Sequence, residues 1–385
     1  MYKRSLSVVA ALALGVSMVF SNSIGTKASE NKGSSEIIVK FKSGTSLAQS
    51  SSLHAKADSQ VIKTNSTLGF QVVKVPAEKS VKQVIQDYQK NSDVLYVEPN
   101  HVYRATLVPN DTDYAKQYAL QKVEAEKAWD ITKGSGQVKI AILDTGVDYN
   151  HPDLKGKVEK GRDFIDNDDD PMDENKHGTH CAGVAAATTN NGVGIAGMAP
   201  NVKILAERVL DAKGNGTADG VASGITHAAD LGAHVISLSL GSPDESKALK
   251  DAVDYAVSKG SIVVAAAGND NSSTPNYPAY YENVIAVAAT DQNDRKADFS
   301  NYGEWVDVAA PGVDIYSTVL DSGYESISGT SMATPLVSGV AGLLASQGKK
   351  ANEIRASLEE TADPIQGTGD SWIHGRINAY KAMSR

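Results

Sequence analysis

Long apolar runs alternate with stretches of helical spacing through residues 107–385. The apolar runs predict buried strands over 138–143, 202–205, 234–240, 262–267 and 284–289. Helical spacing occurs over 219–231, 247–259, 331–347 and 351–361. Strands that are apolar on both faces, separated by helices, indicate a mostly parallel sheet with helices on both of its faces. We therefore predict a doubly wound α/β domain for residues 107–385.

A different pattern precedes this domain. Segments 37–41, 70–75 and 94–97 have the composition of strands, and residues 80–90 have helical spacing. This order predicts a small α+β domain over residues 30–106. Residues 98–110 lack apolar periodicity and are predicted to form a linker.

The first residues have the composition of a secretory signal. Lys3 and Arg4 precede an apolar run over residues 6–20, and a polar stretch then leads to Ala28. This order predicts a cleaved signal peptide over residues 1–29. A membrane anchor is the alternative, but it needs a longer apolar span. We therefore predict a secreted, extracellular protein with no membrane attachment after cleavage.

The charge balance and cysteine count narrow the possible partners. The formal net charge is −9, and the acidic excess lies in residues 107–385. An acidic surface argues against nucleic acid as a partner and is compatible with bound divalent cations. Cys181 is the single cysteine, so no internal disulfide is possible. The apolar core, helped by metal ions, must stabilise the fold.

Three short motifs carry the candidate chemistry. They are Ala-Ile-Leu-Asp-Thr-Gly at residues 141–146, His-Gly-Thr-His at 177–180, and Gly-Thr-Ser-Met-Ala-Thr-Pro at 329–335. They supply a carboxylate (Asp144), an imidazole (His177) and a hydroxyl (Ser331). A serine hydroxyl attacks an amide only when an imidazole removes its proton, and the imidazole needs a carboxylate to orient it. Taken singly, a strand-end aspartate can be a turn residue and a serine before a helix can be an N-cap.

In the order Asp, His, Ser, these motifs resemble the subtilisin family of serine endopeptidases, and its thermitase-like branch most closely. The resemblance covers residues 107–385. It implies that Asp144 orients the imidazole, His177 is the general base and Ser331 is the nucleophile. Residues 30–106 resemble the matching ferredoxin-like propeptide. The resemblance implies a monomeric enzyme that cuts itself after Thr106, with the propeptide serving as its intramolecular chaperone and inhibitor.

The resemblance also implies where protein and peptide substrates bind. Asn269 would donate to the oxyanion together with the backbone N–H of Ser331, although an asparagine after glycine can also simply form a turn. An extended substrate would pair with two exposed backbone segments, and a pocket for a bulky apolar P1 side chain would lie beside them. The residues implied are Gly214, Asn215, Gly216, Ser239, Leu240 and Gly241 for the segments, and Ala266, Gly268 and Asn276 for the pocket.

Three positions depart from the usual family pattern or could be misread. Ala218 replaces a large aromatic and predicts a more open pocket for the fourth residue upstream of the cut, which in the propeptide would be Tyr103. Leu336 replaces a histidine and is expected to pack beneath the nucleophile helix. Cys181, four residues after His177, is interpreted as packed rather than nucleophilic. We expect bulky mercurials to inhibit through it, as in the cysteine-bearing branch.

Calcium is the expected cofactor, at two sites, with a third weaker cation site. The stronger site would combine Asp111, Asp153, Thr189, Asn191, Val193 and Ile195. Of these, Thr189, Val193 and Ile195 would bind through their backbone carbonyls. Residues 163–174 are rich in acidic side chains. They form either a solvated loop whose carboxylates repel one another or a second calcium site. For the second site the resemblance points to Asp163, Asp168 and Asp170, with Asp166 as a further candidate. The third would use carbonyls of Ala279, Tyr281 and Val284, next to a predicted cis peptide at Tyr277–Pro278.

Two other classes of function remain as alternatives. A serine esterase of the α/β-hydrolase type is disfavoured because the Gly-x-Ser-x-Gly elbow is missing and the order of the three residues is different. A catalytically silent binding or adhesion protein on the same fold is disfavoured because the acid, base, nucleophile and Asn269 are all present. The leading hypothesis is a calcium-stabilised serine endopeptidase made as an autoprocessed zymogen.

Overall fold

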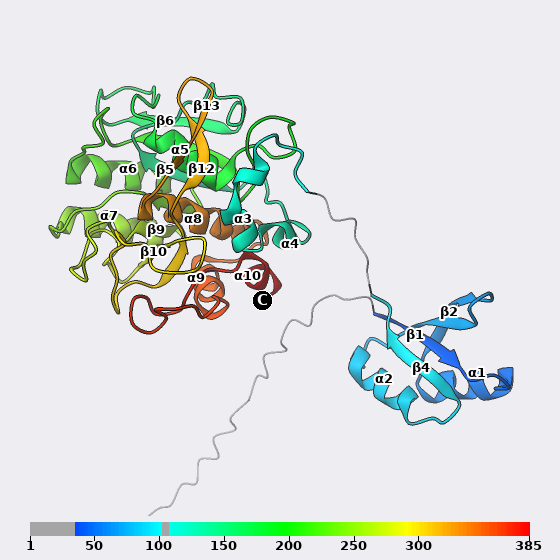
Figure 1. Ribbon diagram of the computed structural model, residues 1–385. Coiled ribbons are helices and arrows are strands. Elements are labelled where there is room, and N and C mark those ends of the chain that lie inside the picture. The colour runs from blue at the N-terminus through cyan, green and yellow to red at the C-terminus, as the bar shows by residue number, and fades with distance from the viewer. Residues whose placement is uncertain (1–34, 102–107) are drawn as a thin grey trace, which may run out of the picture. The chain divides into compact units, whose positions relative to one another are not determined.

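The computed structural model describes residues 35–101 and 108–385 (Figure 1). The chain forms two compact units, Met1–Tyr103 and Arg104–Arg385. This division lies close to the boundary predicted after Thr106. The expected signal peptide, Tyr103 and the expected cleavage point fall outside the described residues.

The N-terminal unit is a four-stranded antiparallel sheet with two helices. Its elements are β1 (Glu36–Phe41), α1 (Leu47–Lys56), β2 (Gln60–Asn65), β3 (Phe70–Lys74), α2 (Val81–Gln89) and β4 (Val94–Pro99). The strand order β2-β3-β1-β4 with this chain order is the ferredoxin-like arrangement. Both helices begin with a serine capping box, Ser46 with Gln49 and Ser80 with Gln83. The α+β prediction is confirmed, although α1 and β2 were not predicted.

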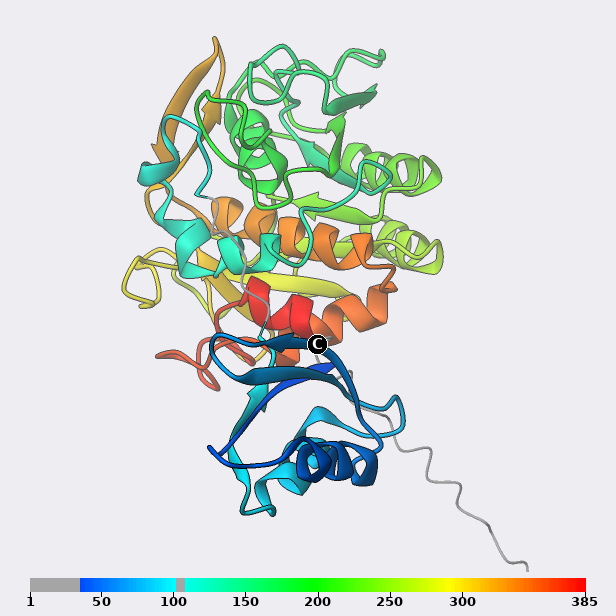
Figure 2. The same ribbon diagram turned by 90° about the vertical axis from the view of Figure 1, so that its right-hand side faces the viewer.

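The C-terminal unit is built on a seven-stranded parallel sheet, with strand order β11-β10-β9-β8-β5-β7-β6. Its strands are β5 (Lys139–Asp144), β6 (Val158–Asp163), β7 (Lys203–Arg208), β8 (Val235–Leu238), β9 (Ile262–Ala266), β10 (Val284–Thr290) and β11 (Val308–Pro311). A separate hairpin, β12 (Ile315–Val319) and β13 (Gly323–Ile327), leads into the nucleophile helix and projects from the sheet in both views (Figures 1 and 2).

Helices cover both faces of this sheet. They are η1 (Tyr114–Lys116), α3 (Tyr118–Lys122), α4 (Ala125–Trp129), α5 (His177–Ala186), α6 (Ala218–Asp230), α7 (Lys247–Ser258), α8 (Thr330–Ser346), α9 (Ala351–Glu360) and α10 (Ala379–Ser384). Successive residues of β5 enter opposite cores: Ile140 and Ile142 pack with α5 and α8, whereas Ala141 and Leu143 pack with α6 and α7. The doubly wound α/β prediction is therefore confirmed. In Figure 2 the teal, orange and red ribbons of α4, α8 and α10 lie together on one face.

The order of the strands decides where a site can form. From β5 the chain runs to the edge strand β6 and returns to β7, which lies between β6 and β5. It then crosses to β8, on the other side of β5, and continues outward to β9, β10 and β11. The connections after β5 and β8 therefore leave in opposite directions, and the carboxyl ends of these two neighbours form a topological switch point, where open α/β sheets bind ligands. β9 lies next to β8. None of the helices within the described ranges is both long and apolar enough to cross a membrane.

Candidate active site

A carboxylate and an imidazole meet at the carboxyl end of β5. Asp144 is the last residue of β5 and is fully buried. Its Oδ1 lies 2.7 Å from Nδ1 of His177, the first residue of α5. The backbone N–H of Thr145 donates to the same oxygen, at 2.8 Å. A Cβ at Gly178 would lie 2.0 Å from the carbonyl oxygen of Gly146, so only glycine lets α5 approach β5 this closely.

The electrostatics of this pair suit a general base. Burial alone would lower the pKa of the His177 imidazole, but the adjacent Asp144 carboxylate outweighs it and holds that pKa well above its usual value. The hydrogen bond at Nδ1 fixes the tautomer and leaves Nε2 available as a proton acceptor. An imidazolium formed at this position is stabilised by the buried carboxylate.

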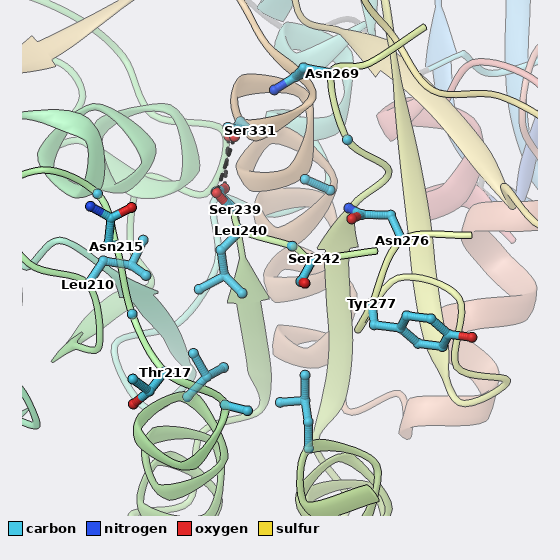
Figure 3. Close-up of a pocket in the computed structure, with 18 of the residues that line it drawn as sticks. Leu210, Asn215, Thr217, Ser239, Leu240, Ser242, Asn269, Asn276, Tyr277 and Ser331 are labelled. Carbon is cyan, nitrogen blue, oxygen red and sulfur yellow. Dashed lines mark hydrogen bonds between the residues drawn. The ribbon is translucent and has the colours of Figure 1, made fainter. Parts of the chain in front are cut away.

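Ser331 is held in the first turn of α8, next to the end of β8. Its hydroxyl donates to the carbonyl of Ser239 at 3.1 Å, and the Ser239 hydroxyl donates back to the Ser331 carbonyl at 2.8 Å (Figure 3). Within the described residues the hydroxyl has this partner rather than the imidazole of His177. Catalytic hydrogen bonds are often long in the free enzyme and tighten when substrate binds. His177 and Ser331 face the same cleft.

Two N–H donors stand beside the Ser331 hydroxyl. Asn269 follows β9 after the left-handed Gly268 (φ 107°). Its Oδ1 accepts from the backbone N–H and the hydroxyl of Thr330, at 2.9 and 3.0 Å. Because the oxygen is fixed in this way, the amide nitrogen is left to donate into the cleft. The N–H of Ser331 lies in the first turn of α8, where backbone N–H groups have no partner within the helix.

One cleft of about 910 Å³ contains these groups and the expected substrate residues. At one end Asn276 lies between two glycines, since a Cβ at Gly241 or Gly268 would come within 2.2 or 3.1 Å of its amide nitrogen. Figure 3 shows Asn276 on the opposite side of the cleft from Asn215. The expected substrate residues that line the cleft are Gly214, Asn215, Gly216, Ser239, Leu240, Gly241, Ala266, Gly268 and Asn276.

The departures from the family pattern have plain structural consequences. Ala218 begins α6 and lines the cleft together with Leu210, Val221 and Leu249. Leu336 is 1% exposed and belongs to the core under α8, as predicted. The peptide bond Tyr277–Pro278 is cis, also as predicted.

Cys181 lies behind the candidate catalytic groups rather than among the residues that line the cleft. It is fully buried, and its thiol is 3.4 Å from the Ser331 carbonyl and 4.0 Å from Nδ1 of His177. Burial raises the pKa of the thiol, which disfavours the nucleophilic thiolate. This placement agrees with a packing role.

The residues expected at the stronger calcium site come together around two buried carboxylates. Asp111 and Asp153 are 5% and 0% exposed. Asp111 accepts backbone N–H groups from Asn190 and Asn191, and Asp153 accepts the N–H of Ile195 at 2.9 Å. In the part of the chain that the structure describes, neither carboxylate forms an ion pair with a lysine or arginine. Two neighbouring buried anions without a cation fit a bound metal ion. Asn191 here turns its amide nitrogen, not its oxygen, toward Asp153.

The acidic loop, residues 163–174, is already paired with cationic side chains from outside the loop. The guanidinium of Arg208 pairs with Asp163, Asp166 and Glu174, at 2.9, 3.0 and 2.7 Å. Lys160 pairs with Asp170 at 2.9 Å. Asp168 accepts the N–H of Asp170. These contacts support a second calcium ion less well than the buried pair supports the first.

The carbonyls expected at the third cation site have other partners. The N–H of Val284 donates to the Tyr281 carbonyl, and Arg355 donates to the Val284 carbonyl at 2.6 Å. Ala279 lies nearby in the same buried cluster. The structure gives no geometric support for a free cation at this position.

Residues that sequence reasoning missed also shape the site. Thr330 fixes the amide of Asn269, and the buried Asp173 bonds to the loop that starts α5. In the sequence, Asp173 is only one of several acidic residues in the segment 163–174. Nothing in the sequence separated this residue from its exposed neighbours.

A hydroxyl, an imidazole and a buried carboxylate, next to two N–H donors in an open cleft, define a serine hydrolase on a parallel α/β sheet. Comparisons with known proteins narrow this class. The chain matches the Subtilase family over residues 135–376 and the Fervidolysin N-terminal prodomain over residues 26–100. The chain therefore belongs to the subtilase family, and it is a serine endopeptidase that carries an N-terminal prodomain.

Individual relatives agree with this assignment. Thermitase of Thermoactinomyces vulgaris is 63% identical over 276 residues, which cover 71% of this chain and 99% of that protein. The Thermophilic serine proteinase of Bacillus sp. (strain AK1) is 53% identical over 352 residues, covering 91% and 87%. Halolysin of Haloferax mediterranei is 41% identical over 339 residues, covering 85% and 65%. The chain is accordingly a thermitase-like subtilisin precursor.

Proposed function

We propose that this chain is a secreted, calcium-stabilised endopeptidase of broad specificity, in which Asp144, His177 and Ser331 form the catalytic triad. The observation that carries the proposal is the 2.7 Å hydrogen bond between His177 and buried Asp144, in the same cleft as Ser331. Residues 1–29 would direct secretion, and the prodomain would be removed by the enzyme's own active site. The prodomain would be its first partner, as chaperone and inhibitor.

The proposed reaction begins when Nε2 of His177 removes the Ser331 proton and the oxygen attacks the scissile carbonyl. The Asn269 amide and the Ser331 N–H would hold the resulting oxyanion. His177, as imidazolium paired with Asp144, would then protonate the leaving amine, and water would release the acyl group in the same way. Because the base must be neutral, activity should rise with pH through the raised pKa of His177, above the ordinary value of 6.5.

Substrate would lie extended between the segments 214–216 and 239–241, using backbone hydrogen bonds that accept many sequences. The pocket that ends at Asn276 would take a bulky apolar P1 side chain. At the far end, Ala218 leaves room for a large fourth residue upstream, and Tyr103 of the propeptide would supply one.

Calcium would bind to Asp111 and Asp153 with the segment 189–195, and more weakly to Asp163, Asp166, Asp168 and Asp170. When bound there it would supply positive charge to buried carboxylates and stabilise the folded state by mass action. It would take no part in the chemical step.

The test uses Ser331→Ala and Asn269→Ala, with Asn293→Ala, an exposed residue outside the cleft, as the matched control. Ser331→Ala should leave the precursor uncut and block labelling by a fluorophosphonate. In subtilisin, from which the figure is known, the donor corresponding to Asn269 contributes about 10²–10³ in kcat, and we expect a similar loss here with KM little changed. Casein cleavage that survives in Ser331→Ala would refute the triad. If the protein were an esterase instead, the fluorophosphonate would label Ser331 but casein would stay intact.

A further inference from the structure

A buried carboxylate beside the catalytic pair takes no part in the reaction proposed above. Asp173 is 4% exposed and lies four residues before His177. Among the described residues it forms no ion pair. A buried anion without a cation must be stabilised by hydrogen bonds, and Asp173 has an unusually complete set of them.

Both oxygens of Asp173 are fully engaged. Oδ1 accepts from the Thr145 hydroxyl at 2.8 Å and from the backbone N–H groups of Asn175 and Lys176, at 2.8 and 3.0 Å. Oδ2 accepts from the backbone N–H and the hydroxyl of Thr179, at 2.9 and 2.6 Å. All five donors approach a group that only accepts, so a carboxylate satisfies them and an amide of the same shape does not.

The two threonines extend this network to the segments that carry the acid and the base. Thr145 follows Asp144, and its hydroxyl also accepts the N–H of Gly178, at 3.0 Å. The Thr179 hydroxyl accepts the N–H of Asp148, at 2.9 Å. Asp173 is thus bonded to the residue after Asp144 and to the first turn of α5, where His177 stands.

The backbone next to His177 also depends on this carboxylate. Lys176 has φ 103°, in the left-handed region that favours glycine, so its conformation carries strain. The N–H of Lys176 donates to Asp173, which holds the strained residue in place. A negative charge at the N-terminus of α5 is further favoured by the helix dipole.

We propose that Asp173 is a positioning residue, which sets the His177 imidazole against the Asp144 carboxylate through Thr145 and Thr179. The inference rests on the proposed triad. Fully satisfied buried networks fix side chains more firmly than single bonds do. The acid and the base come from segments far apart in the chain, and Asp173 is hydrogen-bonded to neighbours of both, Thr145 and Thr179.

The first test is Asp173→Asn, which keeps the shape but presents an NH₂ group to one set of donors. Misplacement of catalytic groups by about 1 Å can cost roughly 10²-fold in rate, so we expect kcat to fall about 10- to 100-fold. KM should change little, because the substrate segments 214–216 and 239–241 are untouched. The apparent pKa of His177 in the kcat/KM profile should also fall, since its coupling to Asp144 weakens. The matched control, Asp169→Asn, changes an 87% exposed carboxylate of the same loop. It should leave kcat, KM and the kinetic pKa of His177 unchanged.

Rates are normalised by active-site titration, so that only folded enzyme is compared. A lower melting temperature with unchanged kcat and unchanged kinetic pKa would make Asp173 merely structural and overturn the proposal. If Asp173→Asn does not mature, the proposal is tested with Thr179→Val and Thr179→Ser instead. Thr179→Val should lower kcat and the kinetic pKa of His177, and Thr179→Ser, which keeps the hydroxyl, should keep both near the parent values. Equal behaviour of the two variants would contradict the network. Activity surviving in Ser331→Ala would instead refute the triad itself, which separates the two failures.

Discussion

Two regions of the catalytic unit concentrate acidic side chains, and they solve the same electrostatic problem in opposite ways. The buried pair, Asp111 and Asp153, has backbone and amide donors around it but no lysine or arginine in contact among the described residues. The acidic loop, residues 163–174, is denser in acids, yet Arg208 and Lys160 neutralise much of it. The sparser region therefore has the greater need for an external cation.

The difference shows that acid density along a sequence is a poor guide to cation need. Exposed carboxylates are stabilised by water, whereas a buried one must be paired or hydrogen-bonded. Two acids of the loop are buried, Asp163 and Asp173. Asp173 is held by hydrogen bonds, whereas Asp163 pairs with Arg208, whose side chain is itself only 5% exposed. The Arg208 guanidinium thus supplies positive charge to the carboxylates of the loop, as we propose calcium does for Asp111 and Asp153.

The largest effect is expected for Arg208→Met. Removing the guanidinium leaves Asp163 buried without its cation, and breaking such a pair typically costs about 3–5 kcal/mol. The free energy of unfolding should be measured on enzyme inactivated with a serine reagent, to prevent self-digestion. Added calcium should recover more stability in the variant than in the parent, because freed carboxylates can bind it. A loss below about 1 kcal/mol, with no greater response to calcium, would show that the loop does not depend on the Arg208 guanidinium.

Chelation should have the next largest effect and should act through the buried pair. Loss of a ligand present at 100 times its Kd costs about 2.7 kcal/mol, or roughly 5–10 °C in melting temperature at about 2–4 °C per kcal/mol. Asp153→Asn should give a similar loss without chelator and little further loss with it. Asp130→Asn, at an exposed position, serves as the control. Thermal inactivation that EDTA leaves unchanged would rule out the stabilising role of calcium.

The central sheet could be predicted because its strands are apolar on both faces. Strands β5, β7, β8, β9 and β10 all overlap the predicted ranges. The edges were missed: β6 has the polar sequence Val-Glu-Lys-Gly-Arg-Asp, and β11 is short and ends at Pro311. Edge strands need not be apolar on both faces, so periodicity does not reveal them. In the prodomain, α1 has a serine-rich sequence with weak helical patterning.

The candidate catalytic groups stand in local motifs that can be recognised in the sequence, whereas the groups that support them do not. Asp144, His177 and Ser331 each stand in a short recognisable segment. By contrast, the bond from Thr330 to Asn269 and the pairing of Arg208 with Asp163 join residues far apart in the chain. Such contacts follow from tertiary packing, which no single segment encodes.

The smallest loss of stability is expected for Asp166→Asn. This variant also tests most directly whether the acidic loop and the buried pair differ in their need for calcium. The Asp166 side chain is 62% exposed and contacts Arg208 at 3.0 Å, and exposed ion pairs contribute only about 0–1 kcal/mol. Its loss should therefore shift the urea midpoint slightly, less so in high salt, and change the calcium dependence of stability much less than Asp153→Asn does. If Asp166→Asn instead reduces that dependence as much as Asp153→Asn does, the acidic loop binds calcium as strongly as the buried pair. Arg208 would then act together with the metal ion rather than as a substitute for it.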